Sequence, residues 1–379
     1  MARSPRLRGI AVLVAAGVLV TGSALVAGAA RSAPALPAVT PAALMARTLR
    51  AAAADPAVSG EVAVHVDLGL PDLGDLGATA GGGAAAVLSS LSGDHRVRVW
   101  NSADGVRVSD LLPAGERSVI VSRSAAWLWD SASMTAVHLH APPGGSGSPG
   151  PAVPPASFDP LQLARQALAA VAPSTKVFVS GTTTVAGRDA YVFRIEPRTS
   201  ATLIGHVDLY MDAARWVPLG GAVYARGAGS PALSARFTSV SFGPIDPAVY
   251  AFTPPPGARV ITPPARRPAP PQMGMANGCL PVLAGCGHGT ASSRAALIAG
   301  RRSPVRVIGS GWSAVAAVRV DSIQSLRAAL SGTGLDPASL LPFSGPLFSA
   351  RLATRGGVTW LLAGAVPQAA LERAAAELP

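Results

Sequence analysis

The chain has 379 residues, of which 49% are hydrophobic and 13% charged, and it carries a formal net charge of +11. A chain of this length and apolar content can bury a core and is longer than one typical domain, so we expect two domains. The positive charge comes almost entirely from arginines that are scattered along the chain, with no aromatic residues between them. This pattern argues against a nucleic-acid-binding protein. It leaves a weak attraction to an anionic membrane surface, which salt screens.

The N-terminus has the organisation of an export signal. Three arginines within the first eight residues precede an uncharged apolar run over residues 9–30, and Ala27 and Ala29 form an A-x-A-like cleavage site. About twenty apolar residues also suffice to span a bilayer. Residues 1–33 are therefore predicted to be a signal peptide or an uncleaved signal anchor, and the protein is expected to be extracytoplasmic, either secreted or anchored in the cytoplasmic membrane. No cysteine lies near the end of this run, which excludes a lipobox lipoprotein.

A helix and a strand are predicted next. Thr40 is an N-cap residue, Pro41 suits the first helical position and Pro56 lies beyond the expected end. The following residues, 59–70, change to a period of two, which indicates a strand with one wet face. Its apolar face is expected to carry Val62, Val64, Val66 and Leu68.

Residues 71–93 are rich in glycine and lack any period, so they predict a long loop. This loop could gate a binding site or touch a membrane, or it could be inert. Alternating patterns then predict a hairpin over 95–112 with a turn at Asp104 and Gly105, and further strands within 117–141. A Pro/Gly/Ser-rich tract leads to a helix, for which Asp159 and Pro160 provide the N-terminal signals.

Residues 185–260 predict an antiparallel meander that ends in a proline block. Gly187 marks a turn before a strand with Tyr191, Phe193 and Ile195 on one face. The next strand is expected to alternate, with Val207, Leu209 and Met211 opposite His206, Asp208 and Tyr210.

The order of these pieces resembles the exported LolA, LolB and RseB proteins, as found in high-GC Gram-positive bacteria. The resemblance is carried by the leading helix, the W-x-W-D hairpin ending at Asp130, the central helix, the meander with its PPPG end and a late GWSAV segment. It implies an α+β fold with a curved antiparallel sheet, a half-barrel lidded by helices, over residues 34–261. A Pro/Gly/Arg-rich linker over 262–304 and a small α+β domain over 305–379 complete the expected organisation.

The resemblance also implies a function. In that family the concave apolar face of the sheet holds acyl chains, so we expect a non-enzymatic carrier or chaperone that binds lipid or a lipoprotein at the outer face of the cytoplasmic membrane. The alternative is an RseB-like regulator that binds a membrane-anchored anti-sigma factor and modulates envelope-stress signalling. The candidate lining residues could equally fill an ordinary core. They are Val64, Val66, Val99, Trp127, Trp129, Phe193, Leu209, Met211 and Phe237.

Both cysteines, Cys279 and Cys286, fall in the linker. In an exported protein two nearby cysteines most simply form a disulfide. A zinc site with His288 lacks an evident fourth ligand, and a redox pair would need the Cys-x-x-Cys spacing. The C-terminal segment predicts strands within 304–320, a helix over 322–332, a hairpin about Gly356 and Gly357, and a closing helix.

No catalytic motif was found in the sequence, and no metal or cofactor is predicted. His138 and His140 lie two apart on one predicted strand face, and we expect them to be exposed beside a buried Val137 and Leu139. Asp208 and Asp212 are expected to be solvated carboxylates.

Overall fold

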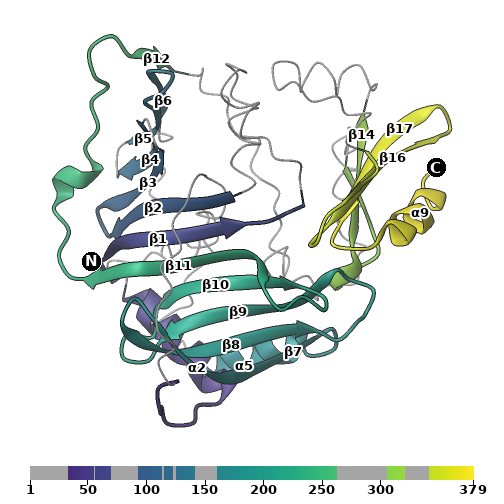
Figure 1. The fold of residues 1–379 in the computed structure, drawn as a ribbon, viewed down its shortest axis with the longest axis horizontal. Coiled ribbons are helices and arrows are strands. Elements are labelled where there is room, and N and C mark those ends of the chain that lie inside the picture. Colours follow the sequence, from purple (N-terminus) through teal and green to yellow (C-terminus); the bar gives the residue numbers. More distant parts are fainter. Residues whose placement is uncertain are drawn as a thin grey trace.

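The computed structural model describes residues 33–54, 56–69, 93–112, 115–122, 125–140, 160–262, 305–320 and 341–379. These residues form two sheets with a few helices (Figure 1). The predicted export signal, the glycine-rich loop, the linker with Cys279 and Cys286, and the helix expected over 322–332 lie outside the described residues. The disulfide therefore stays a prediction.

The larger sheet has twelve strands in the order β12-β6-β5-β4-β3-β2-β1-β11-β10-β9-β8-β7. Neighbouring strands are antiparallel, except that β12 runs parallel to β6. The sheet is not closed into a barrel, and with its helices it confirms the α+β class and the curved, antiparallel architecture. Its strands are β1 (Val58–Val66), β2 (Gly93–Ser102), β3 (Gly105–Leu112), β4 (Gly115–Ser122), β5 (Ala125–Asp130), β6 (Thr135–His140), β7 (Thr175–Val185), β8 (Arg188–Pro197), β9 (Ile204–Asp212), β10 (Pro218–Ala225), β11 (Pro231–Phe242) and β12 (Arg259–Ile261).

The smaller sheet has five strands in the order β13-β14-β17-β16-β15. Its core packs helix α9 (Gln368–Ala376) against β16 and β17 around Trp360, Leu362 and Leu371. The hairpin expected about Gly356 and Gly357 is present, and both glycines have positive φ. The strands are β13 (Val305–Ile308), β14 (Val315–Val320), β15 (Phe343–Ser344), β16 (Ser349–Arg355) and β17 (Val358–Gly364).

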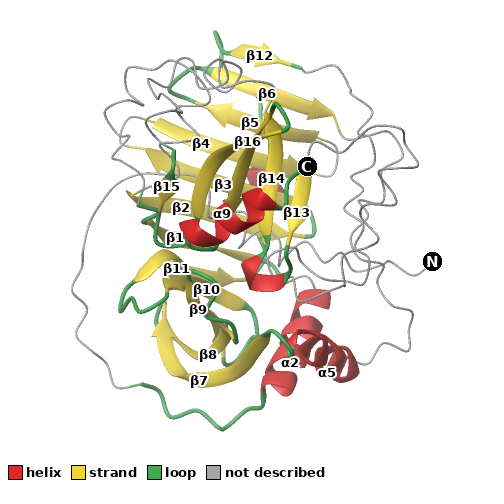
Figure 2. Cartoon of the chain, turned by 90° about the vertical axis from the view of Figure 1, so that its right-hand side faces the viewer, coloured by secondary structure: helices red, strands yellow, loops and turns green. Residues whose placement is uncertain are grey.

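Two helices cover one face of the sheet at β7–β9, as Figure 2 shows beside the lower strands. Helix α2 (Pro41–Ala53) starts as predicted, because the Thr40 hydroxyl accepts a hydrogen bond from the Ala43 N–H. Helix α5 (Pro160–Val171) packs against α2. With the strands below them they form the helix-covered cluster: Leu44, Met45, Leu168, Val177, Tyr191, Phe193, Ile195, Leu209, Met211 and Trp312, with further half-buried apolar neighbours.

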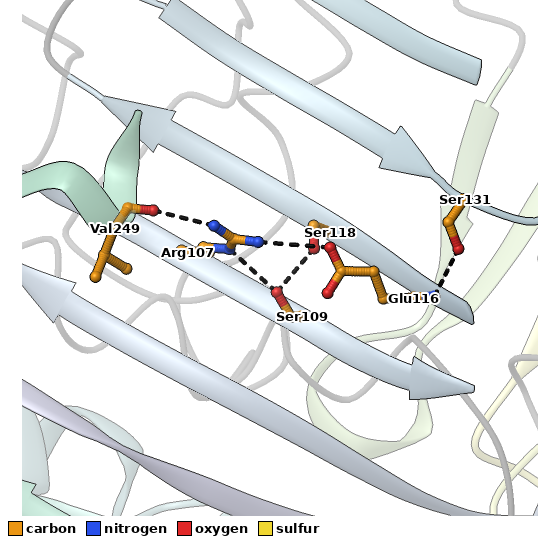
Figure 3. A network of polar contacts seen from close by, with 6 residues as sticks. All are labelled: Arg107, Ser109, Glu116, Ser118, Ser131 and Val249. Carbon is orange, nitrogen blue, oxygen red and sulfur yellow. Dashed lines mark hydrogen bonds and ion pairs between the residues drawn. The ribbon is translucent and has the colours of Figure 1, made fainter. Parts of the chain in front are cut away.

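The segment after β11 returns across the sheet, and we call residues 243–261 the return strap. It contains the short helix η2 (Pro247–Tyr250) and ends in β12. Arg107 on β3 fixes it, because the guanidinium donates to the Val249 carbonyl (3.3 Å) and to Ser109 Oγ (3.2 Å) (Figure 3). Ser109 in turn bonds Ser118 at 2.7 Å. A polar network, buried at Ser109 and Ser118 and half-buried at Arg107, thus attaches the strap to β3 and β4.

The second sheet is joined to the first by specific contacts. Trp312, on a short 3-10 helix η4 (Gly311–Ser313), is buried in the helix-covered cluster and its Nε1–H donates to Thr175 Oγ1 at 2.9 Å. The carbonyl of Ala365 accepts from the Thr202 hydroxyl at 2.7 Å and from the Leu203 N–H at 2.8 Å. The two sheets therefore share a buried aromatic anchor and hydrogen bonds.

Asp208 and Asp212 are buried and paired, which corrects the expectation of solvated carboxylates. Arg194 donates two hydrogen bonds to Asp208, each of 2.7 Å, and Arg188 holds Asp212 in the same two-bond geometry. The two carboxylate side chains are only 6% and 1% exposed. These bonds, more than the charges themselves, raise the pKa of both arginines.

The turn between β7 and β8 gives a first prediction. Gly187 has φ +73° after Ala186 at φ +51°, the two positive values that a two-residue turn of this kind requires. Replacing Gly187 with alanine should lower the free energy of unfolding by about 1 kcal/mol, since a side chain disfavours this conformation. No atom lies within 4 Å of the added Cβ, so the loss is conformational. Gly229→Ala, equally open and without a left-handed φ, is the control in urea unfolding, and equal losses would contradict the explanation.

His206 gives a prediction about pH. Burial, aided by Arg194, lowers the pKa of His206, which stacks on Tyr224 at 4.2 Å between ring centroids. The folded state thus prefers neutral His206, and its stabilisation is complete above the unfolded pKa of about 6.5 and is lost as the pH falls toward the folded pKa. His206→Phe keeps a ring and removes the titration. Urea unfolding is measured at about pH 7.5 and about pH 5. The free energy of unfolding should fall less between the two pH values in His206→Phe than in the wild-type protein. Identical losses in both proteins would refute it.

The Trp312 anchor gives a third prediction. Trp312→Phe keeps an aromatic ring and Thr175→Val keeps the branched shape, but each removes one partner of the buried hydrogen bond. Their effects on the free energy of unfolding should be non-additive by about 1 kcal/mol. A double-mutant cycle measured by urea unfolding tests this coupling, and strictly additive losses would show that the bond contributes nothing.

Candidate functional site

Two apolar rows cross one face of the sheet from β2 to β6. Cross-strand partners in an antiparallel sheet point to the same side, and no register shift interrupts these pairings. One row therefore places five apolar residues on a common face. A second row beside it is also apolar after Asn101. The first row is Val99, Val108, Val119, Leu128 and Val137, and the second is Asn101, Val106, Val121, Ala126 and Leu139.

Burial decreases along the first apolar row from Val99 on β2 to Leu128 on β5, and Val137 on β6 is half-buried. Val99 at the β2 end is 3% exposed and belongs to the core that contains Val62, Val64 and Phe237. Val108 and Val119 are half-buried, and Leu128 on β5 is 41% exposed. The face therefore changes from packed core to open apolar surface across neighbouring strands, and its outer part has apolar area that an apolar ligand can cover.

A charged row borders the apolar rows. Asp110, Arg117 and Asp130 are successive cross-strand partners on β3, β4 and β5, beside Val97 on β2. Arg117 Nε donates to Asp130 Oδ2 at 3.1 Å, and Asp110 is fully buried. An amphiphile whose chain covered the apolar rows would have charged groups close to one side of it.

The structure separates the nine predicted lining residues into three places. Val64, Val66, Val99 and Phe237 lie together in the core at the inner end of the apolar rows. Phe193, Leu209 and Met211 lie in the helix-covered cluster. The third place holds the two tryptophans of the W-x-W-D hairpin.

Trp127 and Trp129 lie on the opposite face from the apolar rows. Trp127 is the partner of Ile120, which follows Val119 in the chain, so the alternation points Trp127 away from Val119 and Leu128. Phe252 of the return strap packs against both tryptophans, with ring centroids 5.4 and 5.6 Å apart. The two tryptophans therefore hold the strap. Because they point to the opposite side of the sheet, they cannot line a common site with Val99.

The strand after them differs from expectation in the same way. His138 is half-buried and stacks on Trp127, with ring centroids 4.1 Å apart, whereas we expected it to be exposed. Leu139, expected to be buried, is exposed, and Val137 is half-buried. The alternation was predicted correctly, but the covered side is the one with the histidine, because the strap packs there.

Several residues of this face were not predicted. Val108, Val119 and Leu128 extend the apolar rows, and His95 is a buried polar residue whose partner across β1 is Val64. The alternation of residues 95–101 contains the signal, since it places His95, Val97 and Val99 on one side. The register of β2 with β3 and of β4 with β5, which unites the rows, could not be found in any single segment.

Among the described residues, no group of three or more histidine, cysteine or acidic side chains is placed to hold a metal ion. None of the helices in the described ranges has the length and apolarity that a bilayer crossing requires.

No protein-family model matches the chain, and no curated protein matches it. Among solved structures, MucB in complex with MucA(peri) is similar over 88% of this chain and 96% of that chain, with 15% identity and a TM-score of 0.41. A LolA superfamily protein from Nitrosomonas europaea is similar over 57% of this chain and 99% of that chain, with 11% identity and a TM-score of 0.23. A putative outer membrane lipoprotein-sorting protein domain from Vibrio parahaemolyticus is similar over 52% of this chain and 91% of that chain, with 10% identity and a TM-score of 0.20.

Identities and TM-scores of this size carry no argument about activity or partners. The described residues themselves form an open antiparallel sheet, with helices on one part of it, and a second small sheet.

Proposed function

We propose that the protein is exported and binds the acyl chain of a lipid or lipoprotein on the apolar rows, as a carrier or chaperone without enzymatic activity. The observation that supports this proposal is the gradient of burial from Val99 to Leu128 along one uninterrupted face. A surface that is apolar over neighbouring strands and opens at one end suits an extended apolar ligand.

The energy of such binding comes from the removal of apolar area from water. Each methylene that an acyl chain buries contributes about 0.8 kcal/mol, so no specific polar chemistry is needed for affinity. The charged row with Arg117 and Asp130 lies beside the chain path and would position a polar head group. The helix-covered cluster is a second apolar region, but α2, α5 and Trp312 already occupy its face.

The proposal predicts the effect of one charge on the apolar rows. Val119→Asp places a carboxylate at the half-buried centre of a row, and binding of a dansylated fatty acid should weaken by at least about tenfold, or about 1.4 kcal/mol. The control is Ala63→Asp, because Ala63 is exposed on the opposite face of β1. Fluorescence titration gives both affinities, and urea unfolding checks that each variant is folded.

A second measurement concerns the natural ligand. Protein purified without detergent should carry acyl chains that native mass spectrometry detects, and the Val119→Asp protein should carry fewer. Wild-type protein that is empty and binds no fatty acid would overturn the carrier function. If the same variant then failed to retain a membrane-anchored protein, the regulatory alternative would replace it.

A further inference from the structure

Exposed apolar side chains gather at the free edge of the larger sheet. Met134 lies in the turn between β5 and β6, Leu128 and Leu139 lie on these strands, and Val260 and Ile261 lie on β12. Their exposed fractions run from 38% for Met134 and Ile261 to 50% for Val260. We call these five residues the apolar rim. Both views show β12 and β6 at the end of the molecule remote from helices α2 and α5.

Side chains of the apolar rim point to both sides of the sheet. Ile261 is the partner of Val137, so it shares a face with Leu128 and the apolar rows. Val260 is the partner of Ala136 and points to the other side, where the strap packs. A rim with exposed apolar side chains on both sides can enter an apolar medium edge-on.

The charge beside the rim is positive. Arg259, the first residue of β12, is exposed, and no carboxylate of the described residues forms an ion pair with it. Its backbone N–H donates to the Met134 carbonyl at 2.8 Å, which places it next to the rim. Asp130 nearby is neutralised by Arg117. An exposed cation beside exposed apolar groups, in a chain of formal charge +11, complements anionic lipid head groups.

A second copy of the chain fits this edge less well. Strand β12 has only three residues, which offers few backbone groups for pairing with another strand. Arg259 would also face its own copy in a symmetric contact.

We propose that the apolar rim, with Arg259 beside it, inserts into the head-group region of an anionic bilayer. Apolar rows that begin at the rim would then continue from the bilayer to the core of the protein. This inference deepens the proposed function and rests on it, because it names the surface at which an acyl chain enters.

Photo-crosslinking tests the insertion in the full chain. Benzoylphenylalanine replaces Val260 in one protein and Val307 in the other, and each is reconstituted with vesicles of phosphatidylglycerol and phosphatidylcholine. Val307 is the matched control, because it is 68% exposed on the short strand β13 of the other sheet. Mass spectrometry should find lipid adducts several-fold more abundant at position 260. Arg259→Gln should reduce them in these vesicles and leave them unchanged in vesicles of phosphatidylcholine alone.

The outcomes separate the rim from the apolar rows. Val260 points away from the rows, so its adducts report the bilayer and not a bound ligand. If the Val119→Asp protein loses fatty-acid binding but still forms lipid adducts at position 260, both proposals are supported: acyl-chain binding by the apolar rows and bilayer insertion by the apolar rim. Three outcomes would overturn the proposed insertion of the rim, even where the rows still bind fatty acid. They are equal amounts of lipid adduct at positions 260 and 307, no lipid adduct at position 260, and an adduct to a second copy of the protein.

Discussion

The pairing of β1 with both β2 and β11 is the constraint on which the rest of the structure depends. It joins residues 58–66 to residues 231–242, and it places the first strand in the middle of a twelve-stranded sheet. Without it, β2–β6 and β7–β11 would be two separate meanders with two free edges each. Because β1 carries Val62, Val64 and Val66 on one side, it also decides which face of both neighbours is buried.

The consequence is a sheet whose two faces are covered by different means along its length. Helices α2 and α5 cover one face at β7–β9, and the return strap covers a face at β3–β6 with Phe252 against Trp127 and Trp129. The apolar rows lie on the other side of those same strands. Their outer residues remain open, although the sequence there is as apolar as in the core. Apolar area kept exposed in this way does not contribute to stability, and it is available to a ligand.

Local signals in the sequence were sufficient for most elements. The Thr40 cap, the turn at Gly187 and the alternation of Tyr191, Phe193 and Ile195 were all predicted, because each depends on neighbours a few residues away. The local signals did not predict which face of the sheet is covered at Trp127, His138 and Leu139. Alternation says that two sets of residues are opposed, but it does not say which set is covered, and here the covering group comes from a segment over 100 residues later in the chain. The burial of Asp208 and Asp212 has the same origin, since their arginine partners lie on a different strand.

The difference between the two groups of aromatic and apolar residues has a physical cause. Tryptophans contribute most when their large rings are fully packed, as Trp129 and Trp312 are. Valine is rigid at χ1, so a surface of valines loses little side-chain entropy when an apolar ligand covers it. The apolar rows consist mainly of valine, leucine and alanine, whereas the tryptophans of the same strands point to the strap. The side chains of these strands are thus divided between a face that holds the strap and the face that we propose to bind an acyl chain.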